Sequence, residues 1–259
     1  AAYEGGDAVG LATVVNVPSD AGGDLGAKLL LRLDGSVVGT LGDRYSDDKA
    51  VEAARRVAEI GNTESFNTET GAEVFVEGFT TPPTLVMVGG GHVGKATADL
   101  AQSLGYQVYV VDDRPEFSNR ERFPDAEQTL VTPYDKWADH VSLNLNTFVV
   151  VATRGHRFDD MALESALGTN ARYIGLLGSR RKTIMIYRRL IEQGTSVERL
   201  RQVHAPIGLD IGGLTPEELA VSIMSEIIMV RRGGKGGSMG MDEWFIERAA
   251  SSAQRAVEV

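Results

Sequence analysis

Three glycines with the spacing G-x-G-x-x-G, at Gly89, Gly91 and Gly94, form a pattern that proteins use to bind phosphate groups. In such a turn the first glycine permits a sharp bend, the second lets the backbone approach a pyrophosphate, and the third lets a helix pack closely on a strand. A helix that starts at His92 and Val93 offers N–H groups and a positive dipole end to an anion. We therefore predict that these five residues bind a phosphate-bearing ligand.

The elements around the turn matter, because a chain with 30 glycines among 259 residues produces the bare motif easily by chance. An apolar strand is expected at 84–88, an amphipathic helix at 91–104 and a second strand at 107–111. Asp112 ends this second strand, roughly 20 residues beyond the turn, where a dinucleotide fold keeps an acid for the ribose. We predict that Asp112 accepts a hydrogen bond from a ribose hydroxyl or from a ring N–H. The alternative is a turn of the same shape that binds nothing, or that binds another phosphate-bearing ligand.

A second group of anion-binding residue types follows the strand expected at 172–177. Gly178, Ser179, Arg180 and Lys182 bring a hydroxyl and cations to a strand-to-helix turn. Cations at a helix N-terminus oppose the helix dipole, so their presence favours a ligand there. A guanidinium and a hydroxyl both bind phosphate or acidic ring oxygens, which predicts a second anion clamp. The alternative is an ordinary helix start with solvated cations.

Four further residues follow strands or lie in a late loop, and ligands of parallel sheets bind at the carboxyl ends of strands. Arg114 follows Asp112, and Thr153 and His156 follow an apolar run at 147–152. His156 has the chemistry to donate a hydrogen bond or move a proton, although a plain surface histidine is equally compatible with the sequence. Asp210 lies in a glycine-rich loop and serves either a ligand N–H or the turn itself. We count Arg114, Thr153, His156 and Asp210 as cofactor-binding candidates.

The elements that must position these residues divide into two groups. Strands, one helix and a strand come first, which predicts a small α+β domain over 1–80. A β-α-β-α rhythm follows, which predicts a Rossmann-like α/β domain with a parallel sheet over 84–232. Residues 233–259 are expected to be a glycine-rich linker and a C-terminal tail. The strands are expected at 9–17, 27–33, 36–41, 73–77, 84–88, 107–111, 127–131, 147–152 and 172–177, and the helices at 47–60, 91–104, 134–141, 158–167, 179–193 and 216–232.

Composition excludes several classes of protein. The net charge of −10 argues against affinity for nucleic acid or for anionic membranes. There is no apolar run of about 20 residues and no signal pattern, so we expect no membrane contact. An acidic chain without disulfides favours the cytoplasm. The chain has no cysteine, so disulfides, Fe–S clusters and cysteine nucleophiles are excluded. Its four histidines show no ligand spacing, and no metal site is expected.

The order of these motifs resembles the XdhC/CoxI family, accessory proteins in the maturation of molybdenum hydroxylases such as xanthine or CO dehydrogenase. The segments that match are 89–94, 112–117, 173–182, 206–211 and 215–220. The resemblance implies a homodimeric chaperone that binds and protects the molybdenum-pterin cofactor, alone or as a dinucleotide. It further implies that a cysteine desulfurase partner helps to supply the terminal sulfur of the cofactor, which then passes to the apo molybdenum hydroxylase.

Two departures from the family pattern are visible. The N-terminal domain of the family often contains a Gly-Gly-Cys segment. The matching residues in this chain, 39–43, include no cysteine, so a thiol contact with the cofactor is excluded. In the loop after the central strand, Arg154 replaces the first histidine of a Thr-His-x-His pattern, while His156 remains. These differences predict a divergent subgroup with another ligand or client.

We therefore expect a cofactor-binding maturation chaperone rather than a catalyst, and no residue is assigned a catalytic role. An NAD(P)-dependent oxidoreductase stays open as an alternative, in which Asp112 favours NAD because an acid repels a 2′-phosphate. Against it, the sequence shows no Tyr-Lys or His-Asp proton relay. A nucleotide-sensing regulatory protein without chemistry is the third interpretation.

Overall fold

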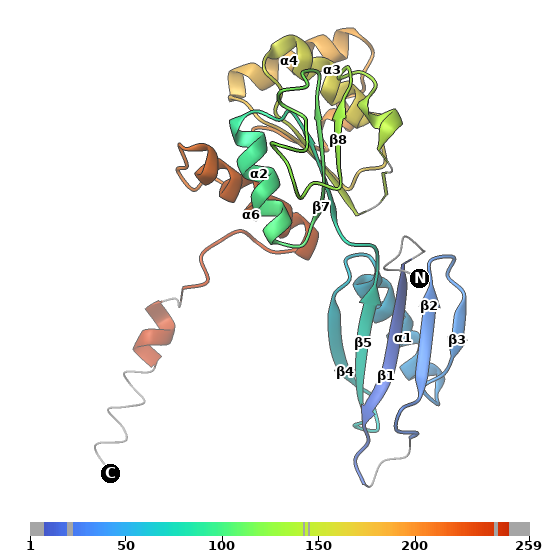
Figure 1. The fold of residues 1–259 in the computed structure, drawn as a ribbon. Helices are drawn as coiled ribbons and strands as arrows, with labels where there is room; N and C mark the ends of the chain where they lie inside the picture. The colour runs from blue at the N-terminus through green and yellow to red at the C-terminus, as the bar shows by residue number, and fades with distance from the viewer. Residues whose placement is uncertain (1–7, 20–22, 142, 145, 241–242, 249–259) are drawn as a thin grey trace.

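The computed structural model describes residues 8–19, 23–141, 143–144, 146–240 and 243–248. The chain forms two sheets, one antiparallel and one parallel, which Figure 1 shows as separate bodies joined near residues 80–83. This arrangement confirms the expected fold class, a Rossmann-like α/β domain preceded by a smaller α+β unit. Among the described residues, no helix has both the length and the apolar character needed to cross a membrane.

The first unit is a five-stranded antiparallel sheet with one helix on it. Its strand order is β3-β2-β1-β5-β4, and β1 pairs with both β2 and β5. Buried and half-buried residues alternate along β1 and β5, as expected for strands with one covered face. The elements are β1 (Val9–Asn16), β2 (Lys28–Arg32), β3 (Val37–Gly39), α1 (Arg44–Ala58), β4 (Thr63–Asn67) and β5 (Glu73–Phe79).

Helix α1 packs on this sheet through small residues. Asp43 caps its N-terminus by accepting from the Ser46 N–H at 2.9 Å. The helix buries Ala50, Ala53, Ala54 and Val57 against the sheet, in one apolar cluster. Alanines bring the helix backbone close to the strands, so the strand positions beneath it must also be small.

The second unit is a six-stranded parallel sheet with the order β11-β10-β9-β6-β7-β8. Because β6 is the first of these strands in the chain, this is the strand order 3-2-1-4-5-6 of dinucleotide-binding folds, with the reversal between β6 and β9. The elements are β6 (Thr84–Val88), α2 (His92–Ser103), β7 (Gln107–Asp112), β8 (Gln128–Val131), η2 (Trp137–His140), β9 (Thr147–Val151), α3 (His156–Leu167), β10 (Tyr173–Leu176), α4 (Arg180–Glu192), α5 (Val197–Leu200), β11 (Val203–His204) and α6 (Pro216–Arg232).

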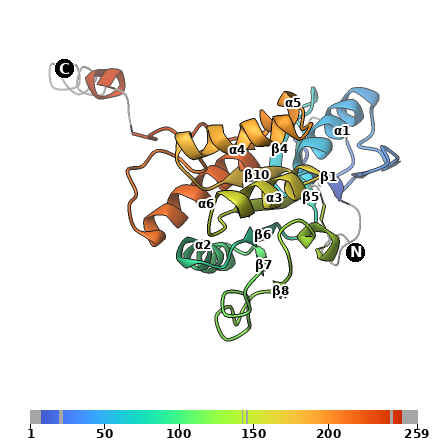
Figure 2. The same cartoon turned by 90° about the horizontal axis from the view of Figure 1, so that it is seen from above.

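Helices cover both faces of the parallel sheet. Residues of α2 and α6 pack with one set of strand side chains, and residues of α3 and α4 pack with the alternate set. Every residue of β6 and of β9 is buried, as expected for central parallel strands covered on two sides. The helices can be followed from above in Figure 2.

Helix α6, expected at 216–232, begins with a capping box. Thr215 accepts from the Glu218 N–H, the Glu218 carboxylate accepts from the Thr215 N–H, and Pro216 begins the helix. The helix expected at 134–141 is wrong in its extent. The structure has only the 3-10 turn η2 there, after Pro133, and Trp137 is fully buried with its indole N–H donating to the Ala162 carbonyl.

Arginines of the second unit contact the first unit at the end of α1. Arg172 donates to the Glu59 carbonyl at 3.3 Å, and Arg231 donates to the Ile60 carbonyl at 3.4 Å. The last carbonyls of a helix lack partners inside the helix and carry partial negative charge, so cations stabilise them. Arg232 adds a hydrogen bond to the side chain of Asn62.

Gly78 in β5 tests the packing of α1 on the antiparallel sheet. A Cβ at this position would lie 2.0 Å from the Val57 carbonyl oxygen of α1, so the helix must shift. We expect Gly78→Ala to lower the free energy of unfolding of this unit by about 1–3 kcal/mol, in urea titrations followed by circular dichroism. Gly237→Ala, where a Cβ meets nothing within 4 Å, is the control and should leave stability unchanged. Equal stability of the two variants would contradict the close contact.

Candidate functional site

The glycine turn after β6 packs tightly at two positions and is open at the third. Gly89 has φ +117°, and a Cβ there would lie 2.2 Å from the Ala152 carbonyl oxygen. A Cβ on Gly94 would lie 2.0 Å from the Gly89 oxygen, whereas a Cβ on Gly91 would meet nothing within 4 Å. Gly91 precedes α2, whose first N–H groups, at His92 and Val93, have no acceptor inside the helix. The open space therefore lies over a helix N-terminus that favours an anion.

Asp112 lies under the turn rather than beside an open cleft. Its side chain is only 1% exposed, and the carboxylate accepts from the Gly90 N–H at 2.9 Å and from the Arg114 N–H and Nε at 3.1 and 3.0 Å. Burial alone would raise the pKa of Asp112, but the hydrogen bonds from Arg114 and Gly90 and the charge of Arg114 hold this pKa below its ordinary value. The carboxylate therefore stabilises the turn, and a contact with a ribose stays a prediction that requires it to exchange partners.

Arg122 supports the same turn and was not predicted from the sequence. Its Nε donates to the Gly90 carbonyl at 3.0 Å, and its Nη2 lies 3.4 Å from the Gly91 carbonyl. The residue belongs to the loop between β7 and β8, which has no helix and no periodic pattern. No signal in the sequence distinguishes Arg122 from other loop cations.

The ends of β9 and β10 are joined by a buried carboxylate. Asp159, in the first turn of α3, is fully buried and accepts from the Thr153 hydroxyl at 2.7 Å. The Lys182 ammonium forms an ion pair with Asp159 at 2.6 Å and donates to the Leu177 carbonyl at 3.2 Å. A Cβ on Gly178 would lie 2.7 Å from the Lys182 side chain, so this glycine lets the lysine fold back. Thr153 and Lys182, which were predicted as ligand contacts, thus have their partners within the protein.

The rim of this edge has cations that face solvent. Ser179 caps α4 by accepting from the Lys182 N–H, and Arg180 and Arg181 are exposed at the start of that helix. Neither arginine forms a hydrogen bond or ion pair with any residue that the structure describes. Asp210 is exposed on the loop that runs beside the end of β10, where the Ile207 N–H donates to the Leu176 carbonyl. His156 begins α3, and its side chain lies outside the described part of the structure.

A pocket of about 260 Å³ lies at the same edge, beside the loops after β7 and β8. Its lining residues are Asp113, Val131, Thr132, Pro133, Tyr134, Phe158 and Met161. The Tyr134 hydroxyl is buried and lies close to the Asp112 carboxylate and the Asp113 backbone. Burial and the carboxylates of Asp112 and Asp113 raise the pKa of Tyr134, which keeps its hydroxyl protonated as a donor. The pocket is therefore a largely apolar space that is large enough for a ring, with the Asp113 carboxylate in its lining.

Charged residues close one side of this pocket. Arg154 forms an ion pair with Asp113 at 2.7 Å, and its guanidinium lies 4.7 Å from the centre of the Phe158 ring. Arg114, a predicted ligand contact, stacks on Phe117 at 3.7 Å and pairs with Asp112. The only sequence signal for Asp113 was its position in a loop that follows a strand. Nothing in the sequence indicated that Tyr134 is buried.

The predicted residues therefore gather at one edge, because β6, β7, β9 and β10 are parallel neighbours and their carboxyl ends coincide. Gly91, Arg180 and Asp210 are exposed or open, whereas Asp112 and Lys182 are held by other residues of the chain. The described residues contain no cluster of three or more His, Asp or Glu side chains with the geometry of a metal site.

Gly94 and Gly91 offer a matched test of the turn. We expect Gly94→Ala to lower the free energy of unfolding by about 1–3 kcal/mol, because its Cβ would overlap the Gly89 carbonyl. Gly91→Ala should cost at most about 1 kcal/mol, since the space around it is open and only the preference at the helix cap changes. Chemical denaturation of both variants measures the difference. A larger loss for Gly91→Ala would contradict the described turn.

The low pKa of Asp112 makes stability depend on pH in a defined direction. Since its pKa is depressed in the folded state, the carboxylate contributes stability above its unfolded value of about 4, and this contribution disappears as the pH falls through the folded pKa. We expect Asp112→Asn to lower the free energy of unfolding by about 2 kcal/mol at pH 7 and to weaken its dependence on pH below about 4. Asp125→Asn, an exposed carboxylate on the same loop, is the control. Parallel pH profiles for all three proteins would refute the assignment.

Both units of the chain match known families. Residues 85–227 match the XdhC Rossmann domain, and residues 2–70 match the XdhC and CoxI family. A solved crystal structure described as a xanthine dehydrogenase from Bacillus halodurans covers 90% of this chain and 94% of its own, with a TM-score of 0.55 and 20% identity. At that identity the likeness shows a shared fold.

Curated relatives agree with these matches. The chain is 32% identical to the uncharacterized protein YqeB of Escherichia coli K12 over 82% of this chain and 42% of the relative. It is 31% identical to a probable xanthine dehydrogenase subunit of Bacillus subtilis over 61% of this chain and 46% of the relative. The molybdenum cofactor insertion chaperone PaoD of Escherichia coli is 25% identical over 61% of this chain and 43% of its own length. The chain thus spans less than half the length of each of these relatives. Because family models match residues 2–70 and 85–227, the chain belongs to the XdhC and CoxI family.

Proposed function

We propose that the protein binds the molybdenum-pterin cofactor at the carboxyl edge of its parallel sheet and assists the maturation of a molybdenum hydroxylase. The observation that supports this most is the combination, at one edge, of an open phosphate cradle at Gly91, free cations and a ring-sized pocket. The names of two relatives, a cofactor insertion chaperone and a probable component of xanthine dehydrogenase, are consistent with it.

The residues at this edge suit such a ligand. A phosphate fits over Gly91, where the N-terminus of α2 supplies N–H groups and a positive dipole end. Arg180 and Arg181 have no internal partner among the described residues, so their charges are available to the same anion or to a second one. A pterin ring carries several acceptors and N–H groups. Tyr134 would pack against the ring as part of the pocket wall, and the Asp113 carboxylate would accept a hydrogen bond from it.

In this proposal the chain binds, orients and shields the cofactor, and the molybdenum chemistry belongs to the cofactor. Phe158 and Met161 provide the apolar wall that excludes water from one side of the ring. A cysteine desulfurase supplies the terminal sulfur, and the apo molybdenum hydroxylase receives the cofactor. A homodimer is the proposed assembly, and the cytoplasm is the proposed compartment.

The geometry also bears on the NAD(P) alternative. A dinucleotide enzyme needs its acid after β7 free for the ribose hydroxyls. Here the Asp112 carboxylate accepts from Gly90 and Arg114 and is 1% exposed. This arrangement favours the maturation chaperone over an NAD-dependent oxidoreductase. Titration with NADH, followed by nicotinamide fluorescence, separates the two, because the chaperone should leave that signal unchanged.

Titration of the purified protein with isolated molybdenum-pterin cofactor tests the proposal directly. We expect saturable binding near micromolar concentrations, and about tenfold weaker binding in Arg180→Ala, since a charge-assisted hydrogen bond is lost. Arg188→Ala on the same helix is the matched control, because Arg188 is also exposed but lies two turns from the helix start. Gly91→Ala should weaken binding without unfolding the protein. Absence of saturable binding, or an equal loss in Arg188→Ala, would overturn the proposal.

A further inference from the structure

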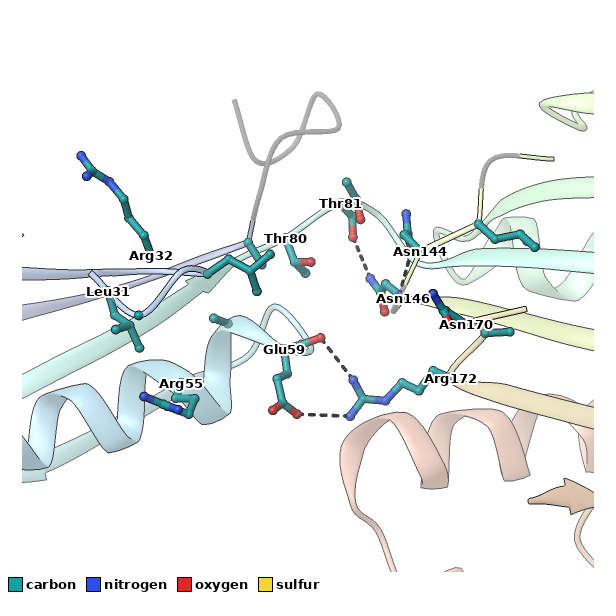
Figure 3. A pocket seen from close by; sticks show the side chains of 16 residues that line it. Leu31, Arg32, Arg55, Glu59, Thr80, Thr81, Asn144, Asn146, Asn170 and Arg172 are labelled. Carbon is teal, nitrogen blue, oxygen red and sulfur yellow. Dashed lines mark hydrogen bonds and ion pairs between the residues drawn. The ribbon is translucent and has the colours of Figure 1, made fainter. Parts of the chain in front are cut away.

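A larger cleft lies at the opposite edge of the parallel sheet, between the two units. Its volume is about 930 Å³, within the range of small-molecule sites, and such sites favour domain interfaces. Figure 3 shows its two walls. Leu31, Arg55 and Glu59 belong to the first unit, and Asn146, Asn170 and Arg172 precede or follow strands of the second. Asn146 and Arg172 directly precede β9 and β10, so the cleft is at the amino ends of the strands, away from the glycine turn.

The charge of this cleft differs from that of the whole chain. The chain has a net charge of −10, yet Arg32, Arg55 and Arg172 line the cleft, and Glu59 is the one carboxylate among the described residues of its lining. Arg55 forms no hydrogen bond or ion pair with any residue that the structure describes. Arg172 reaches across to Glu59, but the ion pair has a long N–O distance of 3.6 Å. This excess of positive charge in the described lining favours an anion, and Arg172 is held there by the long ion pair and by its hydrogen bond to the Glu59 carbonyl at 3.3 Å.

Asn146 supplies a second and independent observation. The residue is only 3% exposed, and its side-chain N–H donates to the Thr81 carbonyl at 2.7 Å. The amide is fixed in this orientation, and its Oδ1 is buried on the wall of the cleft without a hydrogen-bond partner. A buried acceptor without a donor is costly, so it points to a group that supplies an N–H or O–H there.

We propose that this cleft is a second ligand site, which takes a small anion of the nucleoside monophosphate class. The phosphate pairs with Arg55, an acceptor of the base receives a hydrogen bond from Arg172, and an N–H of the base donates to Asn146 Oδ1. Apolar side chains such as Leu31 and Leu143 line the remaining space and suit the flat faces of a base. Because the two arginines come from different units, the bound ligand bridges them. The ligand also competes with Glu59 for Arg172.

Isothermal titration of the full chain with adenosine monophosphate, guanosine monophosphate and inorganic phosphate tests this site. We expect at least one nucleotide to bind, and to bind more tightly than phosphate. Arg55→Ala should weaken that binding about tenfold, because a charge-assisted contact is lost. Arg44→Ala is the matched control, since it removes the same charge from the exposed start of the same helix, where Arg44 pairs with Asp48.

Two further variants separate this site from a purely structural role and from the glycine turn. Glu59→Gln removes the competing carboxylate, so it should preserve or tighten binding, whereas a structural role of the Arg172–Glu59 pair predicts a loss. Gly91→Ala should leave binding unchanged. The proposal is overturned if none of the three probes binds, if phosphate binds as tightly as the nucleotides, or if Arg44→Ala weakens binding as much as Arg55→Ala. It is overturned equally if Gly91→Ala abolishes binding while Arg55→Ala does not. Failure of cofactor binding at the glycine turn leaves this test intact.

Discussion

The buried carboxylate of Asp112 connects the turn after β6 to the loop after β7, and the shape of the carboxyl edge follows from this contact. Through the Gly90 N–H it fixes the backbone that precedes α2, and through Arg114 it fixes the first residues of the long loop. Arg122 returns from that loop to the carbonyls of the same turn. The turn is therefore held on both its N–H and its carbonyl sides, so the open position at Gly91 is rigid before any ligand arrives, and rigidity of this kind lowers the entropic cost of binding.

The cations of the edge fall into two groups with different consequences. Arg114, Arg154 and Lys182 neutralise buried or half-buried carboxylates, and the pairs of Arg154 and Lys182 also connect segments that follow different strands. Arg180 and Arg181 remain exposed at the start of α4. A ligand anion can recruit the second group at little cost, whereas recruiting the first would leave a carboxylate such as Asp159 buried without its partner. The same sheet edge thus separates residues that maintain the scaffold from residues that are available for recognition.

Local patterns made much of this fold predictable, and long-range contacts account for what was missed. Some features can be recognised from a few consecutive residues, namely the glycine turn, the wholly apolar strands and the capping box at Thr215. The polar strand β4 gave no such signal, because its neighbours β5 and α1 stabilise it and its own sequence does not. The roles of Arg122, Tyr134 and Asp159 depend on chain segments that meet only in the folded protein. The inward orientation of Asp112 could not be predicted either, because an aspartate at this position can accept a hydrogen bond from a ribose hydroxyl or from a backbone N–H.

The contacts between the two units are polar, whereas each unit is held together inside by an apolar core. Each apolar cluster in the described part of the chain belongs wholly to one unit. The two units are connected by arginines of the second unit, which donate to residues at and just after the end of α1 in the first. This joint is polar: three hydrogen bonds run from arginines to neutral oxygens, and one ion pair joins Arg172 to Glu59, so a change in the angle between the two units would leave the apolar cluster of each unit intact. Added salt should loosen this joint while leaving each body folded, because screening weakens exposed charge contacts and hardly affects buried carbon.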